Sequence, residues 1–215
     1  MYSQPRSVVI LSNQHFMCAL TLMWINDKII VVRKMEKGGN IPYMTIHLSE
    51  SKSDSNASIG FRAPTKEDGA KIWELIKSTG TLDLNSAYSY LMLCEFFSDT
   101  CVMAEKNEQI VGFVSAFRPP RNRDALFVWQ VAVHASQRGN GIGKKLLKEL
   151  LSRKACDNIH YLQATVTPSN IPSQFLFKGL AKDLNCPCEV SACFEAELFP
   201  EIGHEAEETF KIGPF

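Results

Sequence analysis

From Ile59 onward, hydrophobic and polar positions recur with the periods of strands and helices. Short apolar or alternating runs predict strands, whereas apolar residues three and four positions apart predict helices. Strands are expected at residues 59–64, 100–104, 109–117, 126–133, 161–167, 190–195 and 209–212. Helices are expected at residues 66–78, 86–97 and 142–154, and a fourth begins at 168–170. This order, β-α-α-β-β-β-α-β-α-β-β, predicts an α/β domain around one mixed sheet.

The first part of the chain does not share this regularity and carries no recognisable motif. Val8–Leu11 and Ile29–Val32 are typical of strands, but glycine-rich and polar stretches follow them. We therefore expect residues 1–57 to be an N-terminal extension that is either disordered or the product of an upstream translation start. Residues 58–215 are expected to form the functional domain, because they match the usual size of a single domain.

A particular sequence favours the upstream start. Codons for Lys37-Gly38-Gly39 can match a bacterial ribosome-binding sequence, and Met44 follows shortly after. On this hypothesis residues 1–43 are a translation artefact. The mass of the native protein tests it, because a native chain that starts at Met1 refutes it.

Charge and composition exclude several function classes. The 23 basic and 23 acidic residues cancel, so the chain has no excess field to attract nucleic acid or an anionic membrane. No stretch approaches the roughly 18 apolar residues of a membrane span, and Phe16–Leu20 is too short for a signal peptide. We expect an enzyme of small molecules, without nucleic acid or membrane partners.

The seven cysteines are scattered and indicate neither a disulfide framework nor a metal site. Cys186-Pro187-Cys188 lacks the two-residue gap of a redox or zinc pair, and no cluster has ligand-like spacing, so no metal is expected. Cys94 and Cys101 are expected to be buried packing residues. A reduced cytoplasmic location is the simplest context.

Candidate chemistry enters at Gln137–Gly143, which follows the apolar run Phe127–Val133 and opens an amphipathic helix. Its glycines permit positive φ and a close approach to a ligand. The free N–H groups and the dipole of the following helix attract negative charge. The segment therefore predicts an anion-binding loop.

The spacing excludes the two common nucleotide loops. Gly143-Lys144 is followed by Lys145 rather than by the Ser or Thr of a P-loop, and the glycines are one residue tighter than a dinucleotide fingerprint. Arg138-x-x-Gly141-x-Gly143 instead resembles the pyrophosphate loop of the GNAT superfamily of N-acetyltransferases, which binds acetyl-coenzyme A. The loop alone also fits a glycine-rich turn without a ligand.

Four blocks in the same order strengthen the resemblance: Leu82–Tyr90, Val128–Val133, Thr165–Asn170, and His204–Glu207 with Ile212–Phe215. They are similar to the GNAT family that acetylates L-2,4-diaminobutyrate in ectoine biosynthesis. Over residues 59–215 the resemblance implies the GNAT fold, a mixed central β-sheet flanked by α-helices, and commonly a homodimer. It also implies transfer of acetyl from acetyl-CoA to the γ-amino group, giving N4-acetyl-L-2,4-diaminobutyrate, a compatible-solute precursor.

Acetyl-CoA, the co-substrate, is expected to lie along the fourth strand and the glycine loop. The main chain of the strand would pair with the pantetheine arm, and an N–H near Val131 would stabilise the oxyanion. The resemblance implies that the helix beginning near residue 170 also contacts the coenzyme. The predicted coenzyme-binding residues are Val131, Ala132, Val133, Arg138, Gly139, Asn140, Gly141, Ile142, Gly143, Lys144, Asn170, Ser173 and Phe177. Many superfamily members carry a tyrosine near the position of Phe177 that protonates the thiolate of the departing coenzyme. Phenylalanine cannot donate a proton, so the general acid is unassigned here.

The acceptor side needs a base, because an alkyl ammonium with a pKa of about 10 arrives protonated. The resemblance places the tail beside the acceptor, so Glu207 and His204 are the candidate bases and Trp129 completes the catalytic set. Solvated charges in an acidic tail are an equally good interpretation of Glu207 and His204.

The pocket for the amino acid needs an acid and several hydrogen-bond donors. The predicted substrate-binding residues are Asp83, Asn85, Ser86, Tyr88 and Trp129. Asn85 or Ser86 could instead cap the second helix, and Trp129 could be core. Two other functions stay open: acetylation of another small amine (a diamine, a polyamine or an aminoglycoside), and a non-catalytic acyl-CoA-binding regulator.

Overall fold

The computed structural model of the protein describes residues 19–25, 28–34, 58–200 and 202–215, in two compact units. In the first unit, β1 (Ala19–Ile25) and β2 (Lys28–Lys34) pair antiparallel, and the predicted strand-like segment Ile29–Val32 lies in β2. The other such segment, Val8–Leu11, lies outside the described residues. Disorder or an upstream start of the extension therefore stays a prediction.

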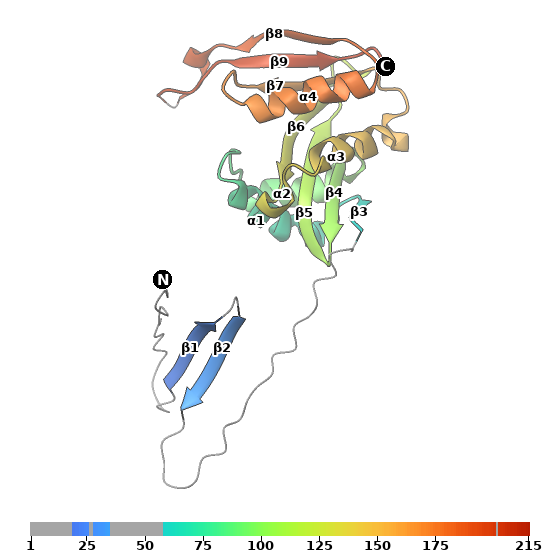
Figure 1. Cartoon of the computed structure of the whole chain (residues 1–215). Helices are drawn as coiled ribbons and strands as arrows, with labels where there is room; N and C mark the ends of the chain where they lie inside the picture. The colour runs from blue at the N-terminus through green and yellow to red at the C-terminus, as the bar shows by residue number, and fades with distance from the viewer. Residues whose placement is uncertain (1–18, 26–27, 35–57, 201) are drawn as a thin grey trace. The chain divides into compact units, whose positions relative to one another are not determined.

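The second unit is built on a seven-stranded sheet (Figure 1). Its strands are β3 (Gly60–Arg62), β4 (Cys101–Lys106), β5 (Gln109–Phe117), β6 (Ala125–Val133), β7 (Tyr161–Val166), β8 (Cys188–Phe194) and β9 (Glu207–Ile212). The spatial order is β3-β4-β5-β6-β7-β9-β8, and every neighbouring pair is antiparallel except β6 and β7. The predicted mixed sheet and its strands are confirmed.

Four α-helices flank this sheet among the described residues of the second unit: α1 (Gly69–Thr79), α2 (Ala87–Phe96), α3 (Ile142–Leu151) and α4 (Ile171–Asp183). Helices α1 and α2 cover one face, and α3 and α4 cover the other (Figure 1). The sequence predicts the helix starts because their caps are local. Ser86 accepts a hydrogen bond from the Ser89 N–H, and Asn170 accepts one from the Ser173 N–H.

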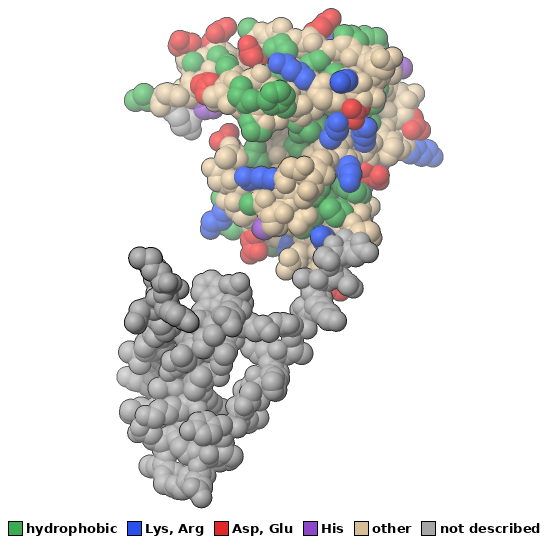
Figure 2. Space-filling view, in the orientation of Figure 1, with side chains coloured by type: hydrophobic (Ala, Val, Ile, Leu, Met, Phe, Trp, Pro, Cys, Tyr) green, Lys and Arg blue, Asp and Glu red, His purple; other side chains and the backbone are tan. Residues whose placement is uncertain are grey.

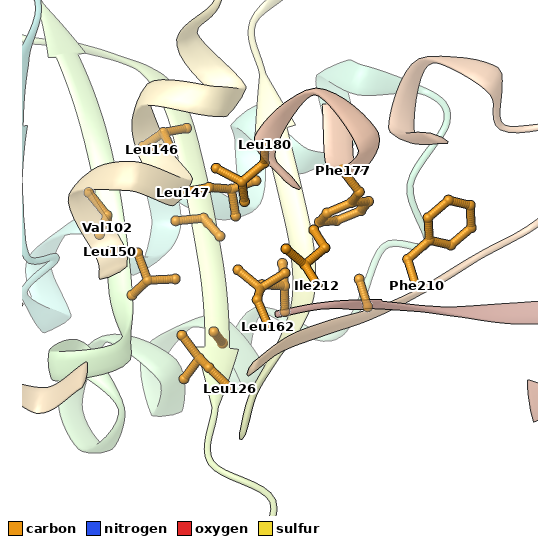
Figure 3. Packing of buried hydrophobic residues seen from close by; sticks show 14 of the residues in the cluster. Val102, Leu126, Leu146, Leu147, Leu150, Leu162, Phe177, Leu180, Phe210 and Ile212 are labelled. Atoms are coloured by element: carbon orange, nitrogen blue, oxygen red, sulfur yellow. The ribbon is translucent and has the colours of Figure 1, made fainter. Parts of the chain in front are cut away.

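Each face of the sheet carries its own hydrophobic core. Figure 3 shows Leu146, Leu147 and Leu150 of α3 packed with residues of β7, α4 and β9. On the opposite face, α1 and α2 pack against β4, β5 and β6 through a cluster that includes Ile72, Ile76, Tyr90, Met103 and Phe113. The apolar stripe predicted for α3 is the buried one, which anchors the glycine loop at the start of that helix.

Strand β6 changes its partners partway along its length. Ala125–Val128 pair with Tyr161–Ala164 of β7, but the pairing stops there, while β7 continues beside β9. On the other side the register with β5 shifts, because Ser115 faces Gln130 whereas Ala116 faces Val128. Trp129 is the extra residue of this β-bulge. The sheet therefore opens between β6 and β7 at the point where the bulge lies.

Candidate active site

A cleft of about 500 Å³ lies where β6 and β7 separate. Its walls come from β6, the end of α1, the start of α3 and the start of α4. The lining residues are Thr79, Thr81, Leu82, Val131, Ala132, Val133, Arg138, Gly143, Thr167, Ser169, Asn170, Pro172, Ser173 and Leu176. The predicted coenzyme-binding residues from β6, together with Arg138, Gly143, Asn170 and Ser173, are thus brought to one place.

The main chain of β6 presents free polar groups to this cleft. The N–H of His134 donates to the carbonyl of Val111 at 2.9 Å, which fixes the hydrogen-bonding phase of β5 and β6. Because such pairs alternate along antiparallel strands, the peptide groups of Val131 and Val133 point away from β5. They face the gap, where β7 no longer pairs. By the same alternation, the N–H and carbonyl of Ala132 point toward β5 and are not available to the coenzyme. Ala132 still lines the cleft, so it can contact the coenzyme only by van der Waals packing.

The glycine loop is held at the cleft by Arg138. Its Nε donates to the carbonyl of Val133 at 3.2 Å, and its Nη2 donates to the carbonyl of Thr79 at 3.5 Å. Gly139 and Gly141 have φ of +80° and +72°, so both lie in the left-handed region that favours glycine. Helix α3 begins directly after Gly141, and its first N–H groups have no partner within the helix. The loop therefore has the geometry of an anion site.

Three predicted coenzyme-binding side chains lie elsewhere. Ile142 is 1% exposed and belongs to the core, so only its N–H can serve a ligand. Nζ of Lys144 lies 3.0 Å from the carboxylate of Asp183, which ties α3 to α4. Phe177 is buried, with its ring 6.3 Å from that of Phe210, and the cleft lining does not include it. Helical spacing turns the Phe177 side chain toward the sheet, and the coenzyme contact expected for Phe177 stays a prediction.

The acidic tail does not lie loose in solvent. Glu207 begins β9, and its Oε2 is buried without a hydrogen-bond partner. Burial raises the pKa of its carboxyl, the negative charge of Asp83 raises it further, and Thr165 and His204 act in the opposite direction. Asp83 and His204 thus both act on the carboxyl of Glu207, and because the Oε2 of Glu207 is buried, the solvated-tail interpretation is wrong for this residue.

His204 has a defined orientation. Its ring stacks on Phe199 with centroids 3.7 Å apart and an angle of 12° between the planes. Its Nδ1 lies 2.7 Å from the carbonyl of Glu205. A carbonyl only accepts, so the neutral ring carries its proton on Nδ1 and leaves Nε2 as a free acceptor. The carboxylate of Glu205 accepts the N–H of Ser169 at 3.0 Å, which joins the tail to the rim of the cleft.

Of the remaining predicted acceptor residues, Asp83, Asn85 and Ser86 lie in the loop between α1 and α2, Tyr88 lies in the first turn of α2, and Trp129 lies in β6. Asp83 and Tyr88 are exposed, and neither lines the cleft, whereas the adjacent Leu82 does. Ser86 caps α2, as its alternative interpretation predicted. Trp129 is 45% exposed, so the core interpretation of Trp129 is wrong.

Sequence reasoning missed the buried polar residues behind this loop. The Nε2 of Gln130 donates to the carbonyl of Asp83 at 2.8 Å, and the hydroxyl of Tyr90 donates to the Oε1 of Gln130 at 3.2 Å. One signal was present, because Gln130 is the only polar residue in the apolar run Phe127–Val133. A lone amide in a central strand indicates a specific hydrogen-bond partner.

The described residues show no group of three or more His, Cys, Asp or Glu side chains that could hold a metal ion. Within the same residues, no helix combines the length and apolar character needed to cross a bilayer. Cys94 and Cys101 are buried, as predicted, and burial raises their pKa values to about 11 and about 12. On the face shown in Figure 2, basic and acidic side chains are interspersed, without a field of one sign.

Comparison with known proteins gives consistent matches. The chain matches the acetyltransferase (GNAT) family over residues 70–181. It is 53% identical to the L-2,4-diaminobutyric acid acetyltransferase of Halalkalibacterium halodurans over 182 residues, 84% of this chain and 95% of the relative. Identity to the enzyme of the same name from Marinococcus halophilus is 56% over 158 residues, 74% of this chain and 91% of the relative.

Among solved structures, the chain is similar to the diaminobutyrate acetyltransferase EctA from Paenibacillus lautus, in complex with its substrate L-2,4-diaminobutyric acid and coenzyme A. The TM-score is 0.72 at 48% identity, with 74% of this chain and 96% of that chain covered. Ard1 from Thermoplasma volcanium shares the fold at 15% identity, with a TM-score of 0.60 and coverage of 73% and 98%.

Proposed function

Because the chain belongs to the acetyltransferase (GNAT) family, we propose that it transfers the acetyl group of acetyl-CoA to the γ-amino group of L-2,4-diaminobutyrate. The observation that carries the proposal is the likeness to EctA of Paenibacillus lautus, a complex with diaminobutyric acid and coenzyme A, of which this chain covers 96% at 48% identity. The product is N4-acetyl-L-2,4-diaminobutyrate.

The thioester would lie along β6. The N–H and carbonyl of Val131 and the N–H of Val133 face the gap and can hydrogen-bond the amides of a pantetheine arm, as an added strand does, whereas the carbonyl of Val133 accepts from Arg138. The pyrophosphate would meet the N–H groups after Gly141, where the helix dipole also favours negative charge. These contacts fix the carbonyl carbon in place, and positioning alone supplies a large part of the rate of acyl transfer.

Glu207 is the proposed general base. Its raised pKa and its unpartnered buried Oε2 suit a carboxylate that takes a proton from an incoming ammonium. The Nε2 of His204 can accept that proton in turn or orient a water between the two groups. The free amine then attacks the carbonyl carbon, and the developing oxyanion accepts a hydrogen bond from the main-chain N–H of Val131.

The nitrogen of the tetrahedral adduct loses its second proton to water in the cleft, and collapse of the adduct then breaks the carbon–sulfur bond and releases coenzyme A as a thiolate. A thiol with a pKa of about 8.5 is a tolerable leaving group without obligatory protonation. No side-chain acid is needed for this step, which agrees with a buried Phe177. The thiolate then takes its proton from solvent.

Recognition of the amino acid is assigned to the loop before α2 and to the bulge. The carboxylate of Asp83 would attract an ammonium group of the substrate, and Trp129 would form an apolar wall with a hydrogen-bond donor. Asn85 and Tyr88 complete the proposed pocket, whereas Ser86 contributes by starting the helix.

Three further statements belong to the proposal. The product would be cyclised by a different enzyme to ectoine, a compatible solute made under osmotic stress. The reaction would take place in the cytoplasm. The protein would be a homodimer, because β8 is an edge strand with Val190 and Phe194 exposed by 43% and 47%. Sedimentation equilibrium at micromolar concentration tests the dimer.

The deciding experiment measures release of the thiol of coenzyme A with diaminobutyrate, 2,3-diaminopropionate, ornithine, lysine and putrescine, and identifies the acetylated nitrogen by NMR. A strong preference for diaminobutyrate with acetylation at the γ-nitrogen supports the proposal. Turnover only with another amine would contradict diaminobutyrate as the acceptor but would still support an N-acetyltransferase. Coenzyme binding without any turnover would instead favour a non-catalytic regulator.

A further inference from the structure

The loop between α1 and α2, residues 80–86, is fixed by side chains that belong to other elements. Gln130 of β6 donates from Nε2 to the main-chain oxygen of Asp83 at 2.8 Å. The hydroxyl of Tyr90, on α2, accepts the main-chain N–H of Asn85 at 3.4 Å. Asp83 and Asn85, two residues assigned above to recognition of the amino acid, therefore owe the position of their main chain to tertiary hydrogen bonds.

These contacts form one continuous chain of hydrogen bonds, which is buried between Tyr90 and Gln130 and partly buried where it reaches the loop. The hydroxyl of Tyr90 donates to the Oε1 of Gln130 at 3.2 Å, and the two residues are 0% and 5% exposed. The indole Nε1 of Trp73, on α1, donates to the carbonyl of Asn85 at 3.2 Å and holds the loop from the other side. Because an unpaired polar group in the interior is costly, removal of one member leaves its partners unsatisfied.

Gln130 also occupies the critical stretch of β6. It follows the bulge residue Trp129 and precedes Val131, whose N–H faces the cleft. One buried side chain thus connects the strand segment that would hold the thioester to the loop that would hold the amine. The side-chain amide of Gln130 therefore fixes the acceptor loop relative to the strand that would hold the thioester.

We propose that Gln130, oriented by Tyr90, is a positioning residue that sets the spacing between the acceptor loop and β6 and so determines which diamino acid places its amine within reach of the thioester. The inference rests on the proposed function, since it takes loop 80–86 as the acceptor loop. It adds to that function the residue that determines which length of diamino acid the enzyme accepts.

The test compares Gln130→Met, which keeps most of the side-chain volume but removes both hydrogen bonds, with Ser115→Ala as a matched control. Ser115 faces Gln130 across the register of β5 and β6, is 0% exposed, and has a hydroxyl without a hydrogen-bond partner. Replacing Ser115 by alanine therefore removes a buried polar atom without removing a hydrogen bond. Tyr90→Phe is the second variant, because it keeps the ring and removes only the hydroxyl.

In Gln130→Met the KM for diaminobutyrate should rise by about tenfold, as expected for loss of a hydrogen bond to a buried group. The dissociation constant for acetyl-CoA should stay within about twofold, because the glycine loop does not depend on Gln130. The preference for diaminobutyrate over ornithine should fall, Tyr90→Phe should move in the same direction, and Ser115→Ala should behave as the original protein.

A fall in melting temperature with an unchanged KM for the acceptor and unchanged preference would overturn the proposal, since it indicates a purely structural role. A parallel loss of acetyl-CoA affinity would overturn it as well. Hydrogen exchange of the main-chain amides in residues 80–86 decides the positioning claim independently of turnover. Faster exchange in Gln130→Met but not in Ser115→Ala supports it, even if the original protein acetylates a different amine; equal exchange contradicts it.

Discussion

The guanidinium of Arg138 donates to the main-chain carbonyl of Val133, with 3.2 Å between Nε and the oxygen. This carbonyl faces the gap between β6 and β7, so Arg138 satisfies a group that a neighbouring strand would otherwise pair. The same side chain reaches the carbonyl of Thr79. The glycine loop, the end of β6 and the end of α1 are therefore joined at one residue.

Arg138→Gln should weaken acetyl-CoA binding by about tenfold, because it removes a charge at the anion site and loosens the loop. Isothermal titration calorimetry measures the dissociation constant. Lys145→Gln is the control, since Lys145 is an exposed residue in the first turn of the same helix. Equal losses in both variants would indicate a general charge effect rather than a role for Arg138.

Glu207→Gln should lower kcat by about a hundredfold or more, the range typical of a lost general base. Because the base must be ionised and burial raises its pKa, kcat/KM should rise as pH increases through that pKa and then level off. The pH–rate profile checks the sign. Glu208→Gln, the neighbouring change on β9, should leave the profile in place.

Asp83→Asn should move the acidic limb of the same profile to lower pH. The charge of Asp83 raises the pKa of Glu207, so neutralising Asp83 makes Glu207 easier to ionise. The profile of kcat/KM is the appropriate one, because it reports groups in the free enzyme. A limb that stays in place would mean that Asp83 exerts no influence on the base.

Asp68→Asn should destabilise the domain by about 1–2 kcal/mol at neutral pH. The carboxylate accepts hydrogen bonds from two guanidinium nitrogens of Arg62, at 2.7 and 2.8 Å, and Arg62 is the main reason that the pKa of Asp68 is lowered to about 2. A lowered pKa contributes stability above the unfolded value of about 4, and that contribution disappears as pH falls toward 2. Urea unfolding at pH 7 and pH 3 should show the difference between variant and original shrinking with acid.

Phe177→Tyr should destabilise the protein by about 1–3 kcal/mol without raising kcat, because the new hydroxyl would be buried among apolar side chains. Thermal unfolding and steady-state kinetics measure the two effects. Phe175→Tyr is the matched control on the same helix, where the side chain is 72% exposed. A faster Phe177→Tyr enzyme would place the hydroxyl at the leaving thiolate and contradict the assigned position.

Local signals explain why the elements could be predicted. Helix α4 begins where Asn170 and Pro172 provide a cap and a first-turn proline, and β5 has the bounds predicted from its apolar run. The glycine loop is also local, since positive φ at Gly139 and Gly141 requires only the residues themselves.

The rest depends on partners distant in sequence. The bulge at Trp129 arises from the register with Ser115, and the gap exists because β7 leaves β6 after Val128. Neither event has a local signature. The burial of Phe177 depends on tertiary packing for a related reason: apolar residues occur on both the cleft side and the core side of α4, so periodicity alone does not distinguish them.

The separation of β6 from β7 has a consequence for solubility. Open strand edges usually lie at the rim of a sheet, where they can recruit strands from other molecules and start aggregation. Here an open edge lies in the middle of the sheet, only from Trp129 to Val133, beside a glycine loop and helix starts that crowd its approach. A thin, extended molecule rich in amides can still reach this edge, whereas the side chains of a second polypeptide strand would meet the walls. The fold can therefore keep unpaired main-chain groups accessible to a ligand without promoting strand pairing between molecules and aggregation.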